Sequence, residues 1–251
     1  MPRKLTLPFY NRPELKKLRI AIEQQENINH ILNLIELRPN DTLLDIGCGA
    51  GNFIREAGTK CQAWGVDPFP LSNAKNIIRG IAEKLPFRKK NIFSVIYFSK
   101  SFMLINREKA FKEIKRVLKP NGKLVIRELL YSPGWDKIIA GVKNKFGLKN
   151  TTLRNHYQRD QEMKNLLINN LKTQGFIIKN IYHFKTYLIY ASRKLLIERF
   201  INFSPLVNLN LKKSINKQDI EKHLKKIVVN FYGPRNNTTV YNNLLIIARK
   251  P

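Results

Sequence analysis

Three glycines spaced two residues apart follow an acidic residue and form the stretch of this chain best suited to bind a ligand. Residues 43–51 read L-L-D-I-G-C-G-A-G. Glycine lets a ligand approach the backbone closely, and a helix that begins near residue 50 would offer its unpaired N–H groups to that ligand. The spacing excludes two nucleotide loops. A dinucleotide loop needs glycine where Asn52 stands, and a P-loop needs Gly-Lys-Ser/Thr.

A second acidic residue, Asp67, stands about 20 residues beyond the first of these glycines, at the end of a second apolar run. In Rossmann-like folds a carboxylate at this distance accepts the ribose hydroxyls of a nucleotide, and its two oxygens suit two donors on one sugar. The alternative role of Asp67 is that of a capping acid before Pro68. Phe69 could pack on the adenine or the ribose, and a core position is an equal alternative.

Four segments in order over residues 42–128 resemble the motifs of class I S-adenosylmethionine-dependent methyltransferases. They read D-I-G-C-G-A-G at 45–51, W-G-V-D-P at 64–68, I-A-E-K-L-P-F at 81–87 and R-V-L-K-P-N-G-K-L at 116–124. The resemblance implies S-adenosyl-L-methionine as the cofactor. The residues that it assigns to cofactor binding are Asp45, Gly47, Cys48, Gly49, Gly51, Asp67, Pro68, Ala82, Glu83 and Phe98.

Several of these positions carry an alternative or depart from the family's pattern. Asp45 would order the glycine loop and reach the methionine amino group, and a turn cap is its alternative. Ile81 replaces the Asp that commonly accepts the adenine amine. Ala82 would still donate its backbone N–H, and Glu83 would partly replace the missing acid or lie on the surface as a solvated charge. Asn121 replaces a glycine of the turn before the fifth strand, and asparagine tolerates the left-handed conformation there.

The sequence indicates the methyl acceptor less clearly than the cofactor. The reason is that the enzyme has mainly to align a nucleophile with a sulfonium that is already reactive. Residues 127–133 look similar to the E-F-S-x-P segment of ubiquinone and menaquinone C-methyltransferases. Glu128 is therefore the first candidate to face the acceptor, and an acid paired with a nearby Lys or Arg is the alternative. Tyr10, Tyr131 and His183 are further catalytic candidates. No His, Cys and Asp cluster has metal-ligand spacing, so no metal is expected.

The chain is strongly basic, with 46 Lys and Arg against 18 Asp and Glu and a net charge of +28. Such a charge favours RNA or an anionic membrane surface as a partner. The Lys-, Asn- and Ile-rich composition that an AT-rich genome encodes explains it equally well, and no protein partner is identifiable. Cys48 and Cys61 suit neither a disulfide framework nor a zinc site. With no apolar leader or bilayer-length apolar run, we expect a cytoplasmic protein with reduced thiols.

Strands that alternate with helices predict an α/β fold, namely a Rossmann-like, seven-stranded, mostly parallel sheet with helices on both faces. By the resemblance, the seventh strand inserts antiparallel beside the fifth. The expected strands lie near residues 42–46, 62–66, 81, 92–98, 123–130, 176–182 and 241–249, and the expected helices at 12–37, from 50, and at 71–79, 106–118, 133–145 and 159–173.

We expect one domain over residues 1–251, with a cofactor-binding core at 38–130. Residues 1–37, 131–160 and 186–232 would form a mostly helical cap. The cap would lie above the carboxyl ends of the strands, where open α/β sheets bind ligands.

Three functions remain open at this point. The first is methyl transfer to an O, N or C centre of a small or lipidic acceptor, which the generic motif set favours. The second is methylation of tRNA or rRNA with the basic cap holding phosphates, although the N/D-P-P-Y/F motif of many nucleobase-methylating enzymes is absent from residues 97–101. The third is binding without catalysis, which Ile81 suggests. The fold alone cannot choose among them.

Overall fold

The computed structural model describes residues 28–130, 133–147, 156–203, 216–232 and 238–251. The elements in chain order are α3 (Asn29–Ile35), β1 (Thr42–Ile46), α4 (Asn52–Ala57), β2 (Gln62–Asp67), β3 (Ile77–Arg79), β4 (Phe93–Ser99), η1 (Phe102–Leu104), α5 (Arg107–Val117), β5 (Leu118–Leu129), α6 (Pro133–Lys145), α7 (His156–Thr173), β6 (Ile177–Ile189), α8 (Arg193–Phe203), α9 (Lys217–Tyr232) and β7 (Thr238–Arg249). None of the described helices is long and apolar enough to cross a membrane.

Seven strands form one sheet in the order β3-β2-β1-β4-β5-β7-β6. The five strands from β3 to β5 run parallel to their neighbours, whereas β7 runs antiparallel to both β5 and β6. This arrangement confirms the predicted mostly parallel sheet with an inserted antiparallel seventh strand. The strand order reverses between β1 and β4, and such a switch point opens a crevice at the carboxyl ends of the strands.

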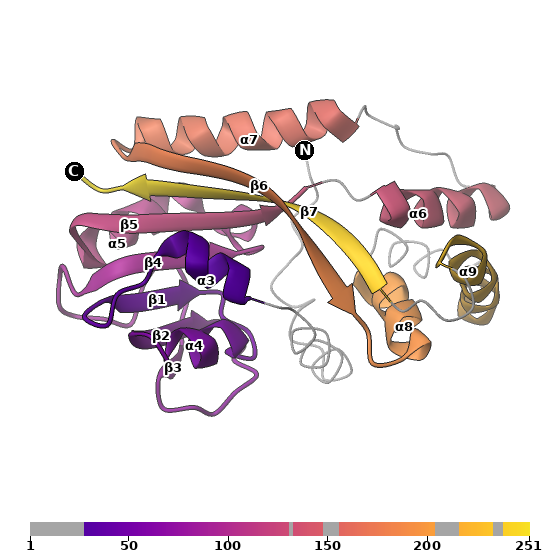
Figure 1. Cartoon of the computed structure of the whole chain (residues 1–251), viewed down its shortest axis with the longest axis horizontal. Helices are drawn as coiled ribbons and strands as arrows, with labels where there is room; N and C mark the ends of the chain where they lie inside the picture. The colour runs from indigo at the N-terminus through magenta and orange to yellow at the C-terminus, as the bar shows by residue number, and fades with distance from the viewer. Residues whose placement is uncertain (1–27, 131–132, 148–155, 204–215, 233–237) are drawn as a thin grey trace.

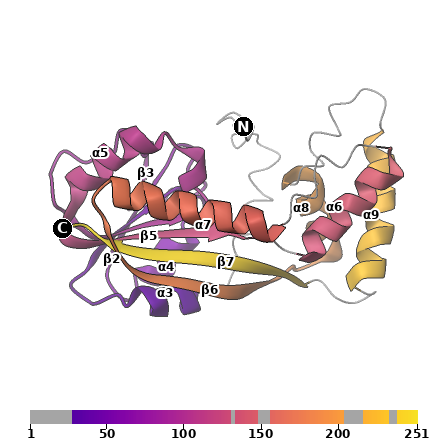
Figure 2. The ribbon, with the colours of Figure 1, turned by 90° about the horizontal axis from the view of Figure 1, so that it is seen from above.

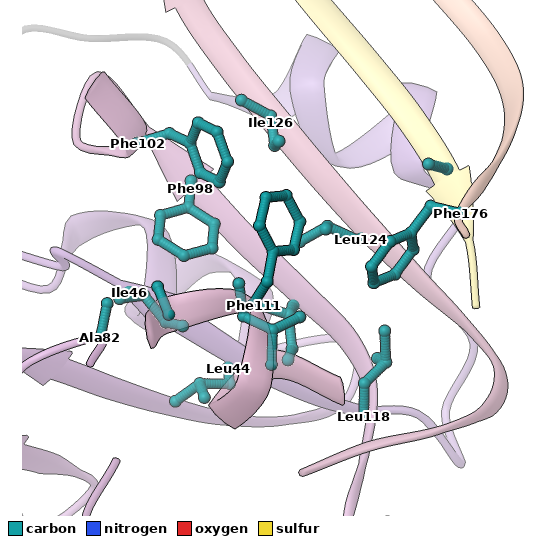
Figure 3. Close-up of a cluster of buried hydrophobic side chains, with 14 of the residues drawn as sticks. Leu44, Ile46, Ala82, Phe98, Phe102, Phe111, Leu118, Leu124, Ile126 and Phe176 are labelled. Atoms are coloured by element: carbon teal, nitrogen blue, oxygen red, sulfur yellow. The ribbon is translucent and has the colours of Figure 1, made fainter. Parts of the chain in front are cut away.

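Helices cover both faces of the sheet, as predicted (Figures 1 and 2). Successive residues of a strand point to opposite faces, so the continuous apolar runs of β1, β4 and β5 supply two cores. On the face under α5 and α7, the rings of Phe98, Phe102 and Phe111 pack edge to face (Figure 3). On the face under α3 and α4, Phe53 stacks on Tyr97 at a ring-centroid distance of 4.0 Å.

The segment after β2 differs from the prediction. The helix expected over residues 71–79 is wrong, because the chain there forms turns followed by β3. Ile77 and Ile78 pair with Gly65 and Val66 of β2, and the Asn76 side chain donates to the Ala63 carbonyl at 2.9 Å. Pairing with β2 thus holds the β-branched residues extended. The strand expected near Ile81 lies earlier than predicted, and Ile81 itself forms only one antiparallel bridge.

Strand β5 begins at Leu118 rather than at residue 123, and it includes the turn that carries Asn121. Asn121 has a φ of 60°, the left-handed conformation expected of the residue that replaces glycine there. Its N–H donates to the Lys250 carbonyl at 3.0 Å. The turn therefore keeps its geometry despite the substitution.

Strands β6 and β7 extend beyond the rest of the sheet as a two-stranded ribbon. The β5–β7 pairing ends at Leu129 opposite Asn243, while the β6–β7 pairing continues to Ile189 opposite Thr238. Residues 186–189, which the sequence analysis assigned to the cap, therefore continue β6. Helices α6, α8 and α9 gather around the far end of the ribbon, beyond the carboxyl end of β5 (Figures 1 and 2). They share a core of their own, which includes Ile138, Val142, Leu188, Leu196, Leu224 and Tyr241.

Candidate functional site

The glycine loop lies at the carboxyl end of β1 and folds tightly under the space above it. Gly47, Gly49 and Gly51 have φ values of 84°, 54° and 79°, a region that side chains disfavour. A Cβ atom on Gly47 would lie 2.6 Å from the Cβ atom of Ser101. The loop therefore requires glycine at Gly47 on two counts, and it leaves bare backbone where a ligand can come close.

Asp67, the last residue of β2, joins this loop to the second strand. Its Oδ2 accepts the N–H of Gly49 at 2.9 Å and its Oδ1 accepts the N–H of Phe69 at 2.7 Å. The carboxylate is only 5% exposed. Each carboxylate oxygen has a second acceptor position, so Asp67 can hold the loop and still accept two ribose hydroxyls.

A cavity separates the glycine loop from the ends of β4 and β5. Its lining at the loop end includes Asp45, Gly47, Cys48 and Asn52, and its lining at the other end includes Tyr97, Ser99, Lys100 and Arg127. The Asp45 carboxylate is buried in this wall. The predicted Asp45 and Gly47 thus share one cavity with residues at the carboxyl ends of β4 and β5. Among the residues that the structure describes, no group of three His, Cys, Asp or Glu could hold a metal ion.

The predicted adenine-side segment lies beside the start of α5. Ala82 is buried, whereas Ile81 is 41% exposed. Oε1 of Glu83 accepts the N–H of Asn106 at 2.7 Å, and the Asn106 side chain accepts the N–H of Lys109. Glu83 therefore helps to fix the first turn of α5, a structural role that the sequence analysis did not assign to it.

Two charged residues of α5 hold the same segment from the other side. Oε2 of Glu113 accepts the N–H of Leu85 at 2.8 Å, and Arg116 donates to the Phe87 carbonyl at 2.7 Å. Arg116 also pairs with Glu113 at 2.6 Å, and its hydrogen bond lowers the pKa of the Glu113 carboxyl below its usual range. Arg116 belongs to the motif that the sequence shares with the family, but its partner Glu113 was missed.

Two further predicted cofactor residues can contribute little through their side chains. The ring of Phe98 is fully buried and faces Phe102 at a centroid distance of 5.2 Å (Figure 3), so only its backbone is free to contact a cofactor. Pro68 is half-buried, and its carbonyl accepts Nε of Arg79 at 3.1 Å. Both residues nevertheless stand at the carboxyl ends of strands that border the site.

Glu128, the first catalytic candidate, lies near the carboxyl end of β5 and is 6% exposed. Burial raises the pKa of its carboxyl to about 7, against hydrogen bonds from the Met103 and Phe102 backbone and the charges of Lys100 and Arg127, which lower it. Oε1 has no hydrogen-bond partner among the described residues. A carboxyl that titrates near neutral pH can accept or hold a proton under physiological conditions.

Glu128→Gln should remove a pH-dependent loss of stability. The carboxyl titrates near 4.5 when unfolded and near 7 when folded. The folded state therefore retains a proton that the unfolded state has lost, and wild-type stability falls as the pH rises from 4.5 through 7. The loss amounts to as much as about 3 kcal/mol, and the glutamine variant should lack it in urea unfolding at pH 5 and pH 8. The exposed Glu108→Gln is the matched control, and an equal pH dependence of Glu128→Gln and wild type would contradict the prediction.

Glu128 does not line this cavity, and neither does any other catalytic candidate that the structure describes. Tyr10 and Tyr131 lie outside the described residues. His183 is exposed on β6, the edge strand, where it pairs with Leu244 of β7, and it does not line the cavity. A histidine inside a strand gave no sign of the face on which it would lie.

One buried charged residue in the wall of the cavity was not predicted from the sequence. Arg127 of β5 is 1% exposed, and its Nε and Nη2 donate to Oδ1 of Asn243 at 2.9 and 2.7 Å. A signal was present, because Arg127 and Glu128 directly follow the apolar run L-V-I of a predicted strand. Charged residues are seldom buried without a partner or a ligand, so Arg127 could have been identified as a site residue together with Glu128.

The comparisons with known proteins agree with this geometry. Residues 44–126 match the model of a family described as a methyltransferase domain. The chain is 33% identical over 124 residues to a sterol 4-C-methyltransferase of Caenorhabditis elegans, and this match covers 43% of the chain and 37% of the relative. The chain therefore spans much less than the full length of this curated relative.

Solved methyltransferases share the fold at low sequence identity. The chain superposes with a TM-score of 0.53 and 19% identity on phosphoethanolamine N-methyltransferase 2 of Haemonchus contortus with S-adenosyl-L-methionine, covering 100% of this chain and 61% of that one. It superposes with a TM-score of 0.51 and 15% identity on a putative methyltransferase of Bacillus halodurans C-125, covering 90% and 99%. At these identities the similarity concerns the fold alone.

Proposed function

We propose that this chain is a class I methyltransferase that transfers the methyl group of S-adenosyl-L-methionine to a small or lipidic acceptor, because residues 44–126 match the model of a methyltransferase domain. The observation that carries the proposal is the junction between Asp67 and the loop of left-handed glycines. It combines a ribose acceptor with bare backbone at the switch point of the sheet.

The residues of the site fit this cofactor. Asp67 would accept the ribose hydroxyls, the glycine loop and Asp45 would contact the methionine portion, and Ala82 would donate its N–H to the adenine. A side chain at Gly47 would collide with Ser101, so glycine keeps the loop packed against the residues that follow β4. When bound, the cofactor supplies the electrophilic methyl group, and the protein has to align the acceptor and exclude water.

A small or lipidic acceptor agrees with two observations. The relative with 33% identity is named as a sterol 4-C-methyltransferase, and the helices of the cap share an apolar core beyond the carboxyl ends of the strands. Glu128, with a pKa near 7, is our candidate to accept a proton if the acceptor must lose one. The net charge of +28 favours RNA as the alternative acceptor.

The acceptor class can be tested by following a radiolabelled methyl group. We expect S-adenosylmethionine with a labelled methyl to transfer label to the organic-soluble fraction of a cell extract and not to bulk tRNA or rRNA. Label in RNA would overturn the proposed acceptor and favour the alternative. Cofactor binding without any transfer would favour a binding protein, and the absence of cofactor binding at millimolar concentration would overturn the enzyme proposal.

A further inference from the structure

Two hollows adjoin each other at the end of the sheet opposite the glycine loop. One has a volume of about 380 Å³, lies beside the end of α3, and is lined by residues of α3, β5, β6 and β7. The other has a volume of about 230 Å³ and lies over the start of β4 and the turn at the start of β5. Lys123 and Arg249 line both hollows. The two hollows therefore form one groove across the amino ends of β4, β5 and β6.

Cationic side chains dominate the lining of this groove, which we call the basic groove. Its five cations are Arg38, Lys119, Lys123, Lys179 and Arg249. Its two acids are Glu36 and Asp41, so the lining carries a net charge of +3. Part of the excess charge of the chain is therefore concentrated in one concave surface.

Most of these cations have no partner of their own in the described part of the chain. No hydrogen bond or ion pair to another described residue is formed by the side chains of Arg38, Lys119, Lys179 and Arg249. The exception is Lys123, whose Nζ donates to the Ile35 carbonyl at 2.7 Å. Like charges gathered in this way repel one another, and an anionic partner would relieve the repulsion.

The charges of the basic groove lie close enough to act on one another. Partial burial lowers the pKa of Lys123, and the charges of Arg249 and Arg38 lower it further. Glu36 and Asp41 raise this pKa but do not restore its usual value. The cations of the two hollows thus belong to one electrostatic unit.

We propose that the basic groove binds single-stranded nucleic acid. One phosphate or carboxylate group needs one cationic pocket, whereas phosphates that recur along a strand match cations spread over two adjoining hollows. The hollows also present groups that can contact bases, namely the amides of Asn121 and Asn180 and the ring of Tyr182. Sites for single strands combine a cationic groove with aromatic side chains in this way. A flat bilayer surface would reach only the rim of the groove.

The place of the groove makes the nucleic acid a docking partner and not a methyl acceptor. The glycine loop follows the carboxyl end of β1, whereas the groove crosses the amino ends of the strands. The five residues of β1 alone separate the two ends by about 15 Å. The inference therefore goes beyond the proposed function and does not depend on it.

Fluorescence anisotropy with a short labelled oligouridylate tests the groove. The double variant Lys179→Gln/Arg249→Gln removes two exposed cations, and we expect it to bind the probe at least about tenfold more weakly than wild type at low salt. The slope of log affinity against log salt should fall by about 1.4, because each cation on a phosphate of a single strand contributes about 0.7.

A second double variant, Lys185→Gln/Lys194→Gln, is the matched control. It removes the same charge from exposed positions of β6 and α8 that do not line the groove. Lys185 lies six residues along β6 from Lys179, about 20 Å away, so salt screens its contribution. The control should keep its affinity for oligouridylate within about threefold. Both double variants should keep the wild-type Tm and the wild-type affinity for S-adenosylmethionine.

Several results would overturn the inference. One is the absence of oligouridylate binding by wild type, and another is an equal loss in the two double variants, which would indicate diffuse attraction. Binding to phosphatidylglycerol vesicles but not to oligouridylate would identify a membrane surface instead. Methyl label that enters RNA with wild type and not with Lys179→Gln/Arg249→Gln would make the nucleic acid an acceptor. Oligouridylate binding that only the groove variant loses, without any binding of S-adenosylmethionine, would overturn the proposed function and leave this inference supported.

Discussion

Asp67→Ala is expected to weaken the binding of S-adenosylmethionine by about 100-fold or more. The substitution removes the acceptor for two ribose hydroxyls, and two hydrogen bonds to a charged group contribute about 3 kcal/mol together. It also releases the N–H groups of Gly49 and Phe69, which the carboxylate now accepts, so the glycine loop loses its tie to β2. Isothermal titration calorimetry with wild type and variant measures the change directly.

Asp41→Ala is the matched control for this prediction. Asp41 also accepts two hydrogen bonds, from Oγ of Ser94 and from the N–H of Arg38, each at 2.8 Å, but it lies before β1, at the end of the strand opposite the glycine loop. It should lose some stability and keep its cofactor affinity within about threefold, a difference below 1 kcal/mol. If Asp67→Ala bound the cofactor as well as Asp41→Ala does, Asp67 would not be the ribose acceptor.

Of the substitutions considered, Gly47→Ala should cause the largest loss of folding stability, and it should also weaken cofactor binding. A side chain at a φ of 84° is strained, and its Cβ would lie 2.6 Å from that of Ser101. Left-handed strain costs roughly 1–2 kcal/mol, and an overpacked contact adds about 1–3 kcal/mol. For a chain of this size the sum corresponds to a drop in Tm of about 10 °C, which thermal unfolding followed by circular dichroism would detect.

Two further substitutions separate strain from collision. Gly175 is also left-handed, with a φ of 76°, but a Cβ there would meet no atom within 4 Å. Gly175→Ala therefore reports the backbone cost alone. In Gly47→Ala, a second substitution, Ser101→Gly, removes the opposing Cβ and should restore the part of the stability that the collision cost. Ser101→Gly must also be measured alone, because its Oγ donates to the Ile46 carbonyl. Additive losses in the double variant would contradict the predicted collision.

Local patterns predicted the parts of the fold whose causes are themselves local. The strands expected near 42–46 and 92–98 and the helix expected at 106–118 each depend on one short stretch of sequence, and β1, β4 and α5 appear where they were expected. The left-handed turn at Asn121 also follows from one residue type. The glycine motif was recognisable because its geometry leaves few alternatives to glycine.

The remaining features depend on contacts between residues that are far apart in the chain. Residues 77–79 form a strand because β2 offers them a partner, which no helical or alternating pattern records. The orientation of Arg127 is set by Asn243, which lies 116 residues later. Likewise, Glu113 reaches Leu85 across 28 residues. A single sequence shows that such polar residues exist, but it does not show which of them will meet.

The ribbon of β6 and β7 has a mechanical consequence for the site. Both strands pass from the sheet into the cap, joined by a ladder whose register shifts once, between Ile178 and Asn180, and then stays regular to Ile189 opposite Thr238. On this side the two-stranded ribbon joins the cap to the sheet. We therefore expect the cap to move by a small twist of this ribbon. Asn243 lies where the pairing of β7 with β5 ends, and its side chain also orients Arg127. The ribbon that carries the cap therefore also supplies the residue that orients Arg127 in the wall of the cavity.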